Sequence, residues 1–221
     1  AKIRGNFMQY YSDRNIGLPE KNNSVISPPV WAGIVALINS FISRNYFAFK
    51  FPLLCDDGQG PYGTDEASLA ATLIAENPKI SWPFEIKKIS DNGFSYEEWA
   101  PDTITILDLI EFCFNYIAAP SQMNYHSFFK HYHLAFDQLS GQRELIDRIN
   151  TIFDRNGIMY NLAENGHINR NNNEPFDFDL NRVIFRTGDS ILDEMLNDSR
   201  QKYLKPQPQF RKESVERLWD S

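Results

Sequence analysis

The sequence is poor in cysteine, in basic charge and in long apolar runs. Its 221 residues include two cysteines, Cys55 and Cys113, which form no CxxC motif and stand beside no histidine. A disulfide scaffold is therefore excluded, and we expect two small, buried thiols in a reduced, cytoplasmic protein. The longest apolar run, residues 30–38, contains a glycine and is far too short to cross a bilayer, so we expect no membrane partner.

The charge balance argues against a nucleic-acid binder. Lysine and arginine number 22 against 29 aspartates and glutamates, which gives a formal net charge of −7. Such a surface repels phosphate on average, and binding of RNA or DNA would need a local basic patch. Aromatic residues are abundant instead, at 14% of the chain with 17 Phe and 10 Tyr. This fraction indicates either a core filled with rings or an aromatic binding face.

Apolar residues recur at helical spacing in several stretches, two of which begin with clear start signals. Ser27 followed by two prolines starts one helix, and Asp102 caps another. The pattern predicts helices over residues 28–45, from 64 or 65 to 76, and over 103–118, 125–133, 142–155, 178–204 and 209–221.

Alternating apolar residues predict a smaller β component. Residues 45–51 are typical of a short strand, and residues 79–101 of short strands or irregular structure. Apolar residues from Ile158 to Ile168 alternate around Asn165-Gly166, which is a good hairpin signal. The predicted fold class is mainly α (α+β): a helical domain with a small β-hairpin and one or two further short strands.

A polar, Asn-rich stretch over residues 169–174 separates two regions. We therefore expect an N-terminal domain, 1–175, and a helical segment, 176–221. The last helix is amphipathic and reaches Ser221 without a residue that would end it. We expect that this segment leads toward a C-terminal domain of a longer protein.

Three of the four histidines, His126, His131 and His133, fall within eight residues. On the predicted helix, spacings of five, seven and two scatter the rings around the axis, whereas metal-binding helices place ligands three or four residues apart. An aromatic-packed helix with histidines at its edges is favoured, and no cofactor is expected. A metal site that joins one of these histidines to Asp108 or Glu111 remains the alternative.

Three other motifs are weaker indications of a functional site. Glu85, Lys87 and nearby Asp91 resemble half of a metal-dependent nuclease site. The glycine-rich stretch 58–64 lacks the Lys-Ser/Thr pair of a phosphate-binding loop, so a structural loop is expected. Asp108 and Glu111 share a helix face and are interpreted as its solvent edge.

One basic surface is a candidate for binding phosphate. Arg148 and Arg155 lie seven residues apart on a predicted helix and share a face. His167 and Arg170, on the predicted hairpin, are expected to extend this surface. Solvated helix faces, with acidic residues between the arginines, are the alternative interpretation.

A longer pattern runs through the second half of the chain. It comprises an acidic apolar helix (107–112), a helix with a late Ile-Asn (144–153), a Tyr-bearing strand (157–162), a Gly-turned hairpin (166–168) and a later Phe-Arg helix start (210–216). This order resembles the N-terminal region of bacterial AbiJ-type abortive-infection proteins, and the resemblance covers about half of the chain. The first hundred residues follow no part of the pattern.

The resemblance has consequences for function. In that family this region leads into a HEPN-like helical domain, the presumed ribonuclease, whose active site uses an Arg followed a few residues later by a His. No Arg stands at that spacing before any histidine of this sequence.

The resemblance implies a non-catalytic sensor or regulatory module of an anti-phage protein. Its partner would be another protein or its own C-terminal effector domain, and a homo-oligomer is compatible with this role. The alternative is a metal-dependent nuclease (RNase) domain of a phage-defence system, and a plain interaction domain is a third interpretation.

Overall fold

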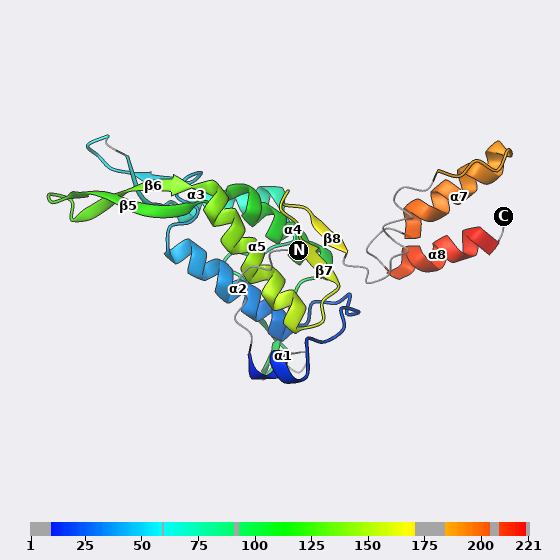
Figure 1. Cartoon of the computed structure of the whole chain (residues 1–221). Helices are drawn as coiled ribbons and strands as arrows, with labels where there is room; N and C mark the ends of the chain where they lie inside the picture. Colours follow the sequence, from blue (N-terminus) through cyan, green and yellow to red (C-terminus); the bar gives the residue numbers. More distant parts are fainter. Residues whose placement is uncertain (1–9, 59, 91–92, 171–183, 204–207, 220–221) are drawn as a thin grey trace. The chain divides into compact units, whose positions relative to one another are not determined.

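The computed structural model describes residues 10–58, 60–90, 93–170, 184–203 and 208–219 (Figure 1). The chain divides into two compact units, residues 1–169 and 170–221. Among the described residues, the first unit contains helices and small two-stranded sheets, and the second contains two helices. The α+β fold class predicted from the sequence is confirmed.

Three helices hold the core of the first unit: α2 (Pro28–Ser43), α4 (Thr103–Tyr116) and α5 (Gln138–Arg155). In Figure 1, α2 and α5 lie side by side, and residues of the two helices are in contact. The side chains at their apolar positions are almost fully removed from water, which is the main favourable term in folding. The most completely buried include Trp31, Ile34, Phe41, Ile106, Leu109, Ile110, Leu145, Ile149 and Phe153.

The helix starts follow the predicted cap signals. Prolines occupy the first turn of α2 after Ser27. The Asp102 carboxylate accepts hydrogen bonds from the Thr105 backbone N–H at 3.1 Å and from its hydroxyl at 2.7 Å. Asp65 caps α3 (Glu66–Glu76) in the same way. Such caps satisfy backbone donors that the first turn leaves unpaired.

Small sheets surround these helices. The elements are β1 (Pro52–Leu54) with β2 (Pro61–Thr64), β3 (Lys87–Ile89) with β4 (Tyr96–Glu98), β5 (Ala119–His126) with β6 (His131–Asp137), and β7 (Tyr160–Leu162) with β8 (Ile168–Arg170). The β7–β8 hairpin is the one predicted from Asn165-Gly166. The β component of the described residues is thus larger than the sequence predicted.

A buried amide joins α5 to the predicted hairpin. Asn150 donates to the Leu162 carbonyl at 2.9 Å and accepts from the Leu162 N–H at 2.8 Å. Both backbone groups of one strand residue are therefore satisfied by one side chain, as buried polar groups require.

The strand predicted over 45–51 is wrong. These residues form consecutive turns: the N–H of Ala48 donates to the Asn45 carbonyl, and that of Lys50 to the Phe47 carbonyl. Asn45 has φ of +63°, a left-handed conformation that Asn tolerates better than most residues. Phe47 and Ala48 are neighbours in the sequence and are both buried. The alternation of apolar residues in this segment therefore did not reflect a strand.

The remaining helices lie at the ends of the chain. Helix α1 spans Tyr11–Asn15, and the second unit contains α7 (Ser190–Tyr203) and α8 (Pro208–Trp219). The helix predicted over 178–204 begins only at Ser190; residues 184–189 are not helical, and 178–183 lie outside the described residues. Ser199 and Ser214 exchange buried hydrogen bonds between α7 and α8. No helix in the described part of the chain has the length and apolar character that crossing a bilayer requires.

Candidate metal centre

The β5–β6 hairpin carries all three clustered histidines. His126 pairs with His131 across the turn 127–130, and His133 follows two residues along β6. Because side chains alternate between the two faces of a strand, and cross-strand partners share a face, the three rings lie on one side. The helix predicted over 125–133 is therefore wrong. Spacings that scatter residues around a helix bring them together across a hairpin.

A β-bulge sets which residues of β5 face this side. The register shifts between Gln122 and Tyr125, so that Ser121 pairs with Ala135 but His126 pairs with His131. An extra residue in one strand reverses the parity of the side chains that follow it. Ser121, which precedes the bulge, and His126, which follows it, therefore lie on the same face of the hairpin as His131 and His133.

The loop between β1 and β2 supplies a cysteine and an aspartate to the histidines. The Cys55 N–H donates to the Gly60 carbonyl and its own carbonyl accepts from the Gly58 N–H, both at 3.0 Å. Gly58 has φ of +73°, which permits this tight turn at little steric cost. β2 contacts β6, and the Tyr62 ring stacks on His131 with centroids 4.4 Å apart.

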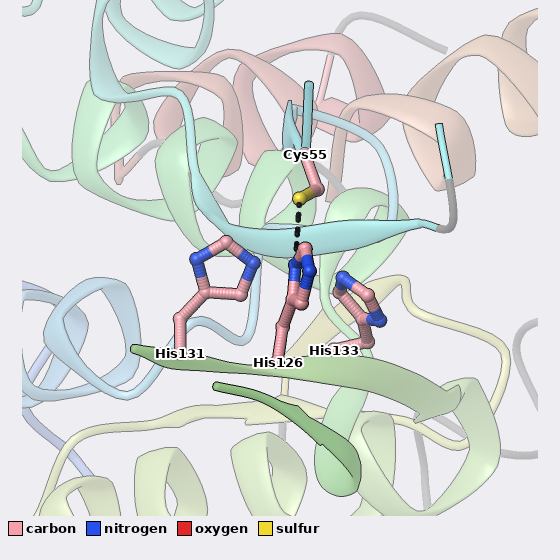
Figure 2. Close-up of side chains that lie close together, drawn as sticks. All are labelled: Cys55, His126, His131 and His133. Carbon is pink, nitrogen blue, oxygen red and sulfur yellow. Dashed lines mark hydrogen bonds between the residues drawn. The ribbon is translucent and has the colours of Figure 1, made fainter. Parts of the chain in front are cut away.

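Four side chains converge in the space between this loop and the hairpin. Figure 2 shows His126, His131 and His133 extending from the hairpin toward Cys55. One ligand atom from each residue lies within 4.8 Å of those from the other three, and Cys55 Sγ is 3.5 Å from His126 Nδ1. Ligand atoms around a tetrahedral zinc ion are ~3.3–3.6 Å apart, given the usual Zn–N and Zn–S bond lengths. The cluster is already near that size.

Asp57 adds a negative charge to the same place. Its carboxylate lies 3.1 Å from His126 Nδ1 and 3.9 Å from His133 Nε2, and its side chain is 18% exposed. Burial raises the pKa of the Cys55 thiol, and the hydrogen bond with Asp57 raises this pKa further. In the absence of a cation these surroundings hold the thiol in its neutral form.

The other predicted site residues do not join this cluster. Arg155 binds the Asp13 carboxylate with Nη1–O distances of 2.7 and 2.8 Å and lies over the Tyr10 ring. It therefore attaches the segment containing α1 to α5. Arg148 is exposed on α5, and His167, also exposed, has Nδ1 4.0 Å from the Glu111 carboxylate. Arg170 ends β8. Phosphate binding by this surface stays a prediction.

The acidic pair and the nuclease-like motif are likewise separate. The Glu111 carboxylate accepts the Ile168 N–H at 2.5 Å, which connects α4 to β8. Partial burial raises the pKa of Asp108, and the neighbouring Glu111 charge adds to this effect. Glu85 and Lys87 are exposed, and Asp91 lies outside the described residues.

Sequence reasoning missed Cys55 and Asp57. Cys55 was expected to be a small buried thiol; it is buried, but it also faces a histidine 71 positions later. Two signals could have found the site: the His-x-His spacing of 131–133, which is a strand spacing, and a cysteine directly before a glycine-rich turn.

Comparison with known proteins gives one result. The model of the family AbiJ N-terminal domain 4 matches residues 9–185 of the 221-residue chain. No curated protein and no solved structure matches the chain. The family match extends over the first hundred residues, which the sequence pattern alone left unassigned.

Proposed function

Because this chain belongs to the AbiJ N-terminal domain 4 family, and thus to the abortive-infection proteins of phage defence, we propose that it is a non-catalytic sensor or regulatory module. Its role is to control an effector rather than to cleave RNA itself. The partner is a HEPN-like effector domain, reached through protein contacts.

The observation that carries this proposal is the closed arrangement of the Cys/His cluster. Catalytic zinc sites use three protein ligands and keep a position open for water or substrate. Here four protein side chains converge on one point, and Tyr62 stacks against one of them. A metal held by all four would have no free position at which to activate a water molecule.

The described part of the nuclease-like motif lies beside ordinary cross-strand charge pairs. On the β3–β4 hairpin Lys87 pairs with Glu98 and Lys88 with Glu97, so acidic and basic side chains face each other across an exposed sheet. The Lys88 ammonium lies 3.6 Å from the centroid of the Trp99 ring. These charges are compensated locally, in the manner of ordinary cross-strand pairs.

The test adds the purified chain in trans to a HEPN-like effector domain of an abortive-infection protein. We expect the chain to change the rate at which the effector cleaves total bacterial RNA. A protein of similar size and net charge serves as the control. An effector rate that is the same with the chain and with the control would refute a regulatory role.

A second arm tests the nuclease alternative directly. The chain alone is incubated with the same RNA in magnesium, in zinc and in EDTA, and we expect intact RNA on a denaturing gel in every lane. Cleavage that is lost in EDTA and in the Glu85→Ala or His131→Ala variant would make this chain an enzyme and overturn the proposal.

A further inference from the structure

We propose that Cys55, His126, His131 and His133 bind one Zn²⁺ ion as a structural site that fastens the β1–β2 loop to the β5–β6 hairpin. This inference uses the same Cys/His cluster as the argument for the proposed function, but it concerns what the four side chains bind and not what the module regulates.

Two ring nitrogens give the strongest indication of a ligand. His131 Nε2 and His133 Nε2 are buried and have no hydrogen-bond partner among the described residues. His133 is only 6% exposed, and its Nε2 is too far from Asp57, at 3.9 Å, for a hydrogen bond. Buried polar atoms are normally paired, so two orphaned nitrogens beside one thiol point to an absent partner.

The chemistry of the four donors selects the partner. Three imidazole nitrogens and one thiolate are ligands of intermediate softness, which suit zinc far better than magnesium or calcium. The largest separation of 4.8 Å must shrink by ~1 Å to reach tetrahedral spacing. Rotation of side chains on a hairpin and an adjoining loop supplies such a movement without any change in the helical core.

The charges also balance. Zn²⁺ with one thiolate and three neutral imidazoles carries a net positive charge, and the Asp57 carboxylate beside His126 neutralises it. Because His126 Nδ1 is also the nitrogen nearest Cys55 Sγ, a metal bound there leaves it no hydrogen to donate, and the Asp57 carboxylate acts on the site through its charge. We therefore assign Asp57 to charge compensation and not to the four ligands.

The site explains how this layer of the structure is held together. Cys55 comes from one hairpin loop, and the histidines come from another hairpin much later in the chain. Neither segment is rich in buried apolar side chains, because β1 and most of β5 are exposed. A metal bond between them would replace the missing apolar contacts.

The test titrates the metal-free full chain with Co²⁺, which reports its ligands by its absorption spectrum, and then displaces it with Zn²⁺. We expect one ion per chain, visible bands of tetrahedral Co²⁺ and a thiolate-to-cobalt band in the near ultraviolet. Cys55→Ser is expected to abolish the thiolate band, whereas Cys113→Ala, which removes the other thiol, is expected to leave it intact.

Two further variants make the test quantitative. Asp57→Asn is expected to lower zinc affinity by roughly 10–100-fold, which is the usual cost of losing a residue that supports the ligands. His133→Ala removes a ligand and is expected to lower zinc affinity by more than that. His167→Ala changes an exposed histidine away from the cluster and is the matched control. Asp57→Asn keeps all four ligands, so it remains informative if a ligand variant does not fold, which circular dichroism reports.

The proposal is overturned by any of four outcomes. The first three are an absence of stoichiometric metal binding by the wild-type chain, an unchanged thiolate band in Cys55→Ser, and an affinity loss in His167→Ala equal to that in His133→Ala. The fourth is a wild-type cobalt spectrum without the thiolate band, as a site with three histidine ligands and a bound water would give. That result would exclude the closed structural site proposed above.

Discussion

Two regions of the first unit are stabilised in different ways. The helices α2, α4 and α5 bury rings and branched side chains almost completely, among them Trp31, Ile110 and Phe153. In the layer formed by the β1–β2 loop and the β5–β6 hairpin, β1 and most of β5 are exposed, and the most buried histidine, His133, lies in a polar cluster. The helical region is therefore held by the hydrophobic effect, whereas the hairpin layer has far fewer fully buried apolar side chains.

Helix α5 connects the two regions. Its N-cap, Asp137, is the last residue of β6, so the hairpin runs directly into the helix. Its first turns pass close to the start of β5, and its later turns deliver Leu145, Ile149 and Phe153 to the core. Changes along this one helix can therefore separate the contributions of the two regions.

The largest expected effect comes from deleting a ring in the core. Phe153→Ala removes a fully buried side chain and should lower the free energy of unfolding by about 3–5 kcal/mol. Phe128→Ala makes the same deletion in the hairpin turn, where the ring is 80% exposed, and should cost no more than ~0.5 kcal/mol. Urea unfolding followed by circular dichroism measures both. Equal losses would contradict the distinction between the two regions.

The connection between the regions is tested by Gly141→Ala. A Cβ at this position would lie 2.6 Å from the Ala119 nitrogen and 2.8 Å from Cα and C of Ala118, all backbone atoms. Alanine favours a helix over glycine by up to ~1 kcal/mol, but an overpacked contact costs ~1–3 kcal/mol. We expect a net loss of stability.

Gly33→Ala is the matched control for that change. Gly33 is an exposed position in the middle of α2, and a Cβ there would meet nothing within 4 Å. The same substitution should therefore raise the free energy of unfolding by up to ~1 kcal/mol. We therefore expect the free energy of unfolding to fall in Gly141→Ala and to rise in Gly33→Ala. A rise in Gly141→Ala as well would show that α5 and β5 are not held in close contact.

The helical region could be predicted from the sequence because its signals are local. Caps such as Asp102 and apolar residues at helical spacing lie within a few positions of one another, and α2, α3, α4 and α5 follow them. The hairpin could not be predicted in the same way. Aromatic and histidine residues from Tyr125 to His133 suit a helix or a strand, and only pairing with residues further along the chain decides between them.

The sequence pointed to the histidines of the candidate metal centre but favoured an aromatic-packed helix over a metal site. The three histidines are close in sequence, so they were recognised as a group. Their geometry was not, because a bulge in β5 determines that His126 faces His131. Cys55 reaches them through a contact between distant segments, β2 against β6, for which the sequence has no local signal.

The smallest expected effect concerns the N-cap at the junction of β6 and α5. Hydrogen bonds from the Ser140 hydroxyl and N–H lower the pKa of Asp137 below its ordinary value of 3.8. A carboxyl whose pKa is lower in the folded state stabilises the protein above the unfolded-state pKa, and this contribution disappears as the pH falls through the folded-state pKa. Stability due to this cap should therefore be constant from pH 7 to about 4 and decline below that range.

Asp137→Asn isolates this effect, because asparagine caps a helix about as well as aspartate but does not titrate. Urea midpoints of the variant and the wild type, measured at pH 7 and pH 3, should show that acid weakens the wild type more than the variant. Ser140→Ala removes the hydroxyl and should give an intermediate pH dependence. If the difference between Asp137→Asn and the wild type is the same at both pH values, the cap does not contribute through its charge.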